Sequence, residues 1–124
     1  MTVHIDTSAL IDALTGPRRS LETLIRLTEE GHRLAISSVV LYEWLRGPRT
    51  KGDLDAQEAL LPSERSVAFG PAEAAVAARL YQAVSKARGR EMDLAVAASA
   101  VAHEAALLTL NPEDFRDLPG LRLI

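Results

Sequence analysis

Four acidic residues have the type and placement needed to bind a metal ion. Asp6 ends a short apolar segment near the start of the chain, Glu43 and Asp93 lie in helical segments, and Asp114 follows another apolar segment. Carboxylates at the rim of an apolar core repel one another and lose solvation unless a cation compensates them. The chain has no cysteine and no histidine cluster, so these oxygen ligands favour Mg²⁺ or Mn²⁺ over zinc.

Each of these acids, taken alone, also has an ordinary structural explanation. Asp6 and Asp114 could cap the helical turns beside them. Glu43 could be a solvated helix residue, and Asp93 could be stabilised by the positive end of its helix. The occurrence of all four in one small chain favours a shared site. A metal ion held there can activate a water molecule for attack on a phosphodiester.

Apolar segments that alternate with glycine and proline predict a series of short strands and helices. We expect strands at residues 3–5, 33–37, 66–69, 107–110 and 121–124. We expect helices at residues 8–14, 18–30, 38–45, 53–61, 72–86 and 91–106. Ser38 is the expected N-cap of the third helix.

Strands that alternate with helices form a parallel sheet covered by helices, so we predict an α/β fold. Ligand sites in such sheets lie beyond the carboxyl ends of the strands. The segments that carry Asp6, Glu43 and Asp114 all leave that edge of the sheet. Asp93 lies in the first turn of a helix whose residues 94–102 are apolar except for Ser99, which indicates a buried helix.

Composition limits the class of protein. A chain of 124 residues with 48% hydrophobic residues predicts one domain, residues 1–124, with its own core, and it excludes a disordered chain. The absence of cysteine excludes a disulfide scaffold. No apolar run approaches the ~20 residues of a membrane span, and the first residues do not resemble a secretory signal, so we expect a cytoplasmic protein.

The motifs around the four acids resemble those of PIN-domain ribonucleases. The matching segments are Ile5–Asp12 around Asp6, Ser37–Gly47 around Glu43, Asp93–Ala100, and Leu108–Phe115 around Asp114. They occur in the family order and span nearly the whole chain. The chain is most similar to the VapC toxins of bacterial type II toxin–antitoxin pairs.

This resemblance implies a PIN-like α/β/α sandwich with a mainly parallel sheet of about five strands. It implies a Mg²⁺- or Mn²⁺-dependent endoribonuclease in which the four acids bind the metal. Thr7, Ser8 and Asn111 match supporting positions that orient a ligand or a water molecule. The implied partners are an RNA substrate, a cognate antitoxin protein and a second copy of the chain in a homodimer.

One departure from the family pattern motivates an alternative. The segment from Arg88 to Asp93 is shorter than is usual before the third acid. The alternative is therefore a PIN-fold binding module with weak or lost nuclease activity. The shortened segment also brings Arg88 and Arg90 towards the site, where they could contact phosphate. Arg46 could contribute to an RNA groove. For all three arginines, an ordinary solvated position is an equally open alternative.

The net charge of the chain is compatible with an RNA partner. The formal charge is −3, but leaving out the four acids of the proposed site changes it to +1. A bound divalent cation shifts the local charge further towards positive. We therefore expect a small metal-loaded site that holds RNA locally, with arginine side chains at its edge.

Overall fold

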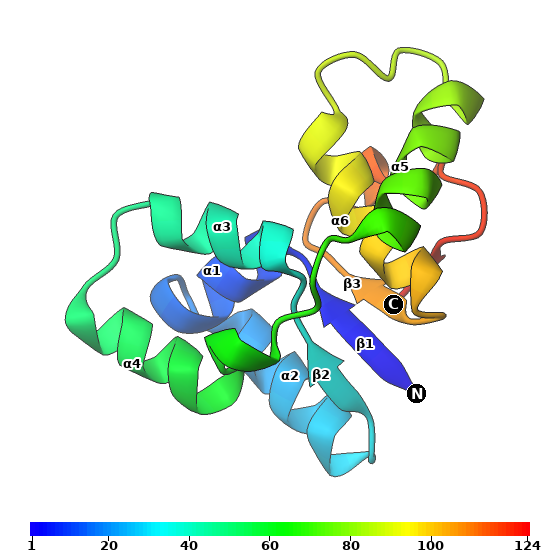
Figure 1. Ribbon diagram of the computed structural model, residues 1–124. Coiled ribbons are helices and arrows are strands. Elements are labelled where there is room, and N and C mark those ends of the chain that lie inside the picture. Colours follow the sequence, from blue (N-terminus) through cyan, green and yellow to red (C-terminus); the bar gives the residue numbers. More distant parts are fainter.

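The computed structural model describes residues 1–124 and contains four strands, six α-helices and two short 3₁₀ helices (Figure 1). The elements in chain order are β1 (Thr2–Ile5), α1 (Thr7–Thr15), α2 (Arg19–Glu29), β2 (Arg33–Ala35), α3 (Ser38–Arg46), α4 (Lys51–Leu60), η1 (Ser63–Arg65), α5 (Pro71–Ala83), α6 (Glu91–Ala102), β3 (Ala106–Leu108), η2 (Pro112–Asp114) and β4 (Arg122–Leu123). None of the helices is long and apolar enough to cross a lipid bilayer.

The strands form one parallel sheet in the order β2-β1-β3-β4. Strand β1 is paired on both sides, with Val3 opposite Leu34 of β2 and opposite Ala106 of β3. Because side chains alternate along a strand, Val3 and Ile5 point to one face of the sheet, whereas His4 points to the other. The predicted α/β fold with a parallel sheet is confirmed.

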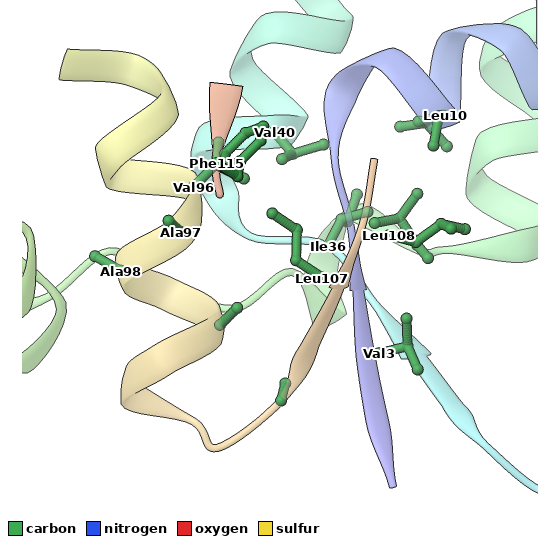
Figure 2. Close-up of a cluster of buried hydrophobic side chains, with 14 of the residues drawn as sticks. Val3, Leu10, Ile36, Val40, Val96, Ala97, Ala98, Leu107, Leu108 and Phe115 are labelled. Carbon is green, nitrogen blue, oxygen red and sulfur yellow. The ribbon is translucent and has the colours of Figure 1, made fainter. Parts of the chain in front are cut away.

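Helices cover both faces of this sheet. Figure 2 shows Val3 and Leu108 on the side of α1, which carries Leu10, and Leu107 on the opposite side, towards α6. Helix α6 packs against both α5 and β3. Its residues Val96 and Ala97 are buried, as expected from a helix that is apolar on nearly every side.

The sheet has fewer strands than the approximately five that were predicted. The segment at residues 66–69 forms only an isolated parallel bridge, in which Val67 pairs with Ser37 beside the end of β2. Val67 donates to the carbonyl of Ile36 at 2.8 Å and accepts from the amide of Ser38 at 2.8 Å. The 3₁₀ turn η1 comes just before this segment, and Phe69 after it is exposed, so pairing does not extend further.

Several helix boundaries also differ from the prediction, among them the N-cap of α3, the end of α5 at Ala83 and the end of α6. The N-cap of α3 is Ser37, whose hydroxyl accepts a hydrogen bond from the Val40 amide at 3.2 Å, and not Ser38. Helix α6 ends at Ala102 and not at residue 106, because Glu104 adopts a left-handed conformation with φ 54°. This early end allows Ala106 to begin β3 beside β1.

Candidate acidic site at the carboxyl end of the sheet

Asp6 lies between β1 and α1, and the residue is only 5% exposed. It occupies the N-cap position of α1, but its carboxylate makes no capping hydrogen bond. Instead, Oδ2 accepts hydrogen bonds from Ser8 Oγ at 2.9 Å and from Thr109 Oγ1 at 2.7 Å. The capping explanation for Asp6 therefore does not hold, and its second oxygen, Oδ1, forms no hydrogen bond to a protein side chain.

The hydroxyl groups that hold Asp6 are themselves fixed by the backbone after β3. The Leu110 amide donates to Ser8 Oγ at 3.1 Å, and the Asn111 amide donates to Thr109 Oγ1 at 3.0 Å. This network links the start of α1 to the segment after β3. Asn111, which was predicted as a supporting residue, takes part through its backbone amide.

Glu43 comes from the middle of α3 and faces the start of α1. Thr7 Oγ1 donates to Glu43 Oε1 at 2.7 Å, and Arg46 Nη2 lies 3.5 Å from Glu43 Oε2. The Glu43 side chain is 16% exposed, so it is not a freely solvated helix residue. Helices α1 and α3 are in contact, and this packing brings the second acidic segment next to the first.

Asp93, in the first turn of α6, is influenced by the other three acids. Burial, followed by repulsion from Asp6, Asp114 and Glu43, raises the pKa of Asp93 to about 6, while Arg90 opposes the shift. A carboxyl group responds in this way only when the other carboxylates are near it in a poorly solvated environment. The sequence segments that carry the four acids therefore come together at one end of the sheet.

The four carboxylates are near one another but do not form a closed cage. No group of three or more acidic or histidine side chains is close enough together to hold one ion by itself. Mg²⁺ commonly retains several waters and binds through one or two carboxylates together with substrate phosphates. The oxygen-only donor set fits such a partly hydrated ion.

Asp114 lies in η2 and is exposed, and its position is fixed through the backbone. Arg90 Nη2 donates to the Asp114 carbonyl at 2.9 Å, and the same guanidinium forms a two-point contact with Asp117 at 2.7 and 2.8 Å. This contact lowers the pKa of the Asp117 carboxyl. The guanidinium of Arg90 thus connects the segment before α6 with the segment after β3.

Sequence reasoning missed Thr109 and Asp117. Thr109 directly follows β3, and it could have been found from the rule that polar side chains at the carboxyl ends of adjacent parallel strands meet. Asp117 gives no comparable signal, because its contact with Arg90 spans 27 residues between two irregular segments. Arg88 is exposed and forms no ion pair, and the aromatic ring of Trp44 beside Glu43 is buried in the core.

Comparison with known proteins gives consistent matches. The family model described as "PIN domain" matches residues 3–121. Ribonuclease VapC19 of Mycobacterium tuberculosis is 32% identical to this chain over 120 residues, which is 95% of each protein.

Solved structures match over nearly the whole chain. A chain of VapBC2 from Rickettsia felis, bound to a promoter DNA fragment, superposes with a TM-score of 0.80 at 23% identity and covers 100% of this chain and 98% of that chain. A chain of VapBC-5 from Mycobacterium tuberculosis, a member of a toxin–antitoxin family, gives a TM-score of 0.69 at 24% identity, with coverages of 99% and 97%. At these identities the solved structures show a shared fold.

Proposed function

This chain belongs to the PIN-domain family, and we propose that it is the toxin of a type II toxin–antitoxin pair, a Mg²⁺- or Mn²⁺-dependent endoribonuclease. The observation that carries the proposal is geometric: the buried carboxylate of Asp6 is held by Ser8 and Thr109 with its Oδ1 unengaged, and the neighbouring residue Thr7 holds Glu43. The raised pKa of Asp93 agrees with carboxylates in its surroundings. Repulsion between neighbouring carboxylates is unfavourable in an unliganded protein and is relieved by a divalent cation.

In this proposal Asp6, Glu43, Asp93 and Asp114 hold the metal ion. When bound, the ion would lower the pKa of a water molecule and stabilise negative charge on the phosphate that is cleaved. The oxygen-only character of the four side chains and the unengaged Oδ1 of Asp6 support this assignment.

The hydroxyl groups of the chain have an orienting role in this mechanism. Thr7 donates to Glu43 Oε1 and Ser8 donates to Asp6 Oδ2, so each hydroxyl group orients one carboxylate. Thr109 adds a second donor to Asp6 Oδ2. Because these hydrogen bonds are already formed, the acids need little rearrangement when a cation arrives.

RNA would be held at the edge of this site by arginine side chains. Arg46 is more than half exposed, lies 3.5 Å from Glu43 and stacks over the Tyr42 ring at 5.4 Å. A guanidinium beside an exposed aromatic ring suits contact with an unpaired base and its phosphate. Arg88 is free to contact phosphate as well, whereas Arg90 contributes mainly by holding Asp114 and Asp117.

Protein partners are part of the same proposal. The solved VapBC relatives are toxin–antitoxin assemblies, which supports a cognate antitoxin for this chain. Exposed apolar side chains at Tyr42 and Leu45 on α3, and at Phe69 and Tyr81 near and on α5, support a protein-binding surface for the antitoxin or for a second copy in a homodimer. Light scattering of the purified chain with and without its antitoxin measures both assemblies.

The test is cleavage of a labelled single-stranded RNA by the purified chain with Mg²⁺, with Mn²⁺ and with a chelator. We expect cleavage only with a divalent ion, and we expect Asp6→Asn and Asp93→Asn to abolish it. Asp55→Asn is the matched control, because Asp55 is an exposed aspartate on α4 that pairs only with Lys51. Cleavage by Asp6→Asn at the rate of the unsubstituted chain would contradict the assignment.

The same experiment separates the alternative function. The absence of a three-acid cluster favours a PIN-fold binding module with weak or lost nuclease activity. In that case, the unsubstituted chain would show no cleavage and no rise in melting temperature with Mn²⁺. A melting-temperature rise that disappears in Asp93→Asn would support the metal-dependent enzyme.

A further inference from the structure

A cavity lies beside the edge strand β2, and none of the four acids lines it. Its volume is about 660 Å³, and it lies along β2 from Arg33 to Ile36, beside Thr2 and His4 of β1 and the connection that contains η1. Thr2 and His4 of β1 line it, on the same face of the strand as Asp6. Helix α6 packs beside β3 and helix α2 contacts β2, and the connection from Leu60 to Val67 lines the cavity beside β2.

The lining of this cavity is positively charged. Arg33 of β2 and Arg65 of η1 both line it, and no aspartate or glutamate does. Neither arginine takes part in any ion pair of the molecule. Arg33 pairs in register with Thr2, so the two side chains leave the sheet on the same face. Two guanidinium groups without acidic partners in one concave space form a site for an anion.

The polar neighbours of the arginines add further hydrogen-bonding groups. His4 is 2% exposed, and its Nδ1 has no hydrogen-bond partner. His103, which also lines the cavity, stacks on His4 with ring centroids 6.0 Å apart and is held by Glu73 at 2.7 Å. Thr2 contributes a hydroxyl group. Because donors greatly outnumber acceptors, the site favours a ligand rich in acceptor oxygens.

The size of the cavity and the apolar part of its lining limit the kind of ligand that fits. The volume is far larger than a single phosphate group requires, and it is in the range of small-molecule sites. Leu34, Leu61, Pro62 and Val67 supply apolar parts of the lining. A phosphate ester that carries a flat, largely apolar ring satisfies both parts of the lining.

We propose that this cavity is a second ligand site, which binds a phosphorylated nucleoside through Arg33 and Arg65. The nucleoside phosphate can be a free nucleotide or one unit of an RNA strand, since both present the same phosphate and base. The proposal does not depend on the acidic site or on nuclease activity, because none of the four acids lines the cavity.

The experiment is calorimetric titration of the full chain with adenosine 5′-monophosphate, with inorganic phosphate and with a short single-stranded RNA. All titrations contain a chelator, so that cleavage does not interfere. The variants are Arg33→Gln, Arg65→Gln and the double substitution. Both arginines are exposed, so the variants are expected to fold, and melting curves check this. Arg79→Gln, an exposed arginine on α5 outside the cavity, is the control for general charge.

We expect saturable binding of the nucleotide, weaker binding of inorganic phosphate, and a loss of about tenfold in affinity for each arginine removed. Arg79→Gln should bind like the unsubstituted chain. If RNA binds and competes with the nucleotide, the site accepts a unit of an RNA strand; if the nucleotide binds and RNA does not compete, the ligand is a free nucleotide. No binding of either ligand, or equal losses in Arg79→Gln, would overturn the proposal.

Discussion

The two ends of strand β1 differ in the charge of their surroundings although they share one face of the sheet. Asp6, at the carboxyl end, is one of three carboxylates whose charge acts on Asp93, whereas Thr2, at the amino end, lies in a cavity with Arg33 and Arg65. The two positions are four residues apart, or about 13 Å along an extended strand. A short strand therefore separates a site suited to a cation from a site suited to an anion.

This difference shows how binding sites can be told from structural ion pairs. Arg90 and Asp117 satisfy each other with two contacts, and they connect two segments of the chain. At both ends of β1, in contrast, charges of one sign gather without enough opposite charge in the protein. Gathered like charges are unfavourable in the unliganded molecule and become favourable when a ligand of opposite charge binds.

The largest expected effect is on the rate of RNA cleavage, and it comes from removing the charge of Asp6 at the carboxyl end of β1. Asp6→Asn should lower the rate of metal-dependent RNA cleavage by roughly a thousandfold, since a loss of about 4 kcal/mol of transition-state stabilisation is expected at a metal ligand. The affinity for adenosine 5′-monophosphate should stay the same, because Asp6 does not line the cavity. Parallel cleavage and calorimetry assays check both. A loss of nucleotide affinity together with cleavage would mean that the two ends are one site.

A second prediction concerns the hydroxyl group that holds Asp6. Thr109→Val keeps the shape of the side chain but removes the donor to Asp6 Oδ2 and the acceptor for the Asn111 amide. Thr109 is 7% exposed, so we expect the free energy of unfolding to fall by about 2 kcal/mol. Thr28→Val is the matched control, because Thr28 is an exposed threonine in α2, and it should change stability by less than about 0.5 kcal/mol. If chemical denaturation gives equal losses of stability for Thr109→Val and Thr28→Val, the hydrogen bonds of Thr109 do not organise the carboxyl end of the sheet.

A third prediction tests repulsion at the carboxyl end directly. The pKa of Asp93 is raised to about 6, so its ionised form is disfavoured in the folded state, and stability is lost as the pH rises through that value. Asp93→Asn removes this cost and should stabilise the metal-free protein at pH 7 by about 1 kcal/mol, after allowance for partial exposure to solvent.

The pH dependence of the stability difference between Asp93→Asn and the unsubstituted chain is the control for this prediction. The stabilisation by Asp93→Asn should shrink as the pH falls from 7 towards 4, because the native carboxyl group becomes protonated and neutral there. Thermal melts with a chelator at several pH values measure it. A variant that is less stable than the native chain at pH 7 would show that Asp93 does not experience net repulsion.

The smallest expected effect is a change in melting temperature at Glu73 of α5, which contacts His103 of the cavity lining. Hydrogen bonds from its own backbone amide and from the Gly70 amide, followed by His103, lower the pKa of Glu73. Its ionised form therefore contributes stability that is present at neutral pH and is lost as the pH falls through the lowered pKa. Glu73→Gln should cause a small decrease in melting temperature at pH 7 that disappears in acid. A pH-independent decrease would indicate a packing effect alone.

The sequence was sufficient to predict the fold class and the approximate place of each helix. Glycine and proline mark most helix ends, and the apolar segment after Asp93 correctly indicated a buried helix. The fifth strand was predicted wrongly because Val67 has the apolar neighbours of a strand but only one paired partner. Pairing depends on the path of the neighbouring backbone, and this path is not visible in the local sequence.

The candidate site was less predictable than the fold. The motif residues indicated which acids belong together, and their assignment as metal ligands stays a prediction. The hydroxyl of Thr109 and the contact between Arg90 and Asp117 depend on how distant segments approach. The cavity beside Arg33 and Arg65 was not visible in the sequence, because its lining comes from segments that are far apart in the chain and not from a motif.

The fork between Arg90 and Asp117 has a consequence for motion in the acidic site. Arg90 lies three residues before Asp93, and it also binds the Asp114 carbonyl. Arg90 therefore links the segment that carries Asp93 to the segment that carries Asp114. These contacts restrain the two acidic segments relative to each other before any ligand binds.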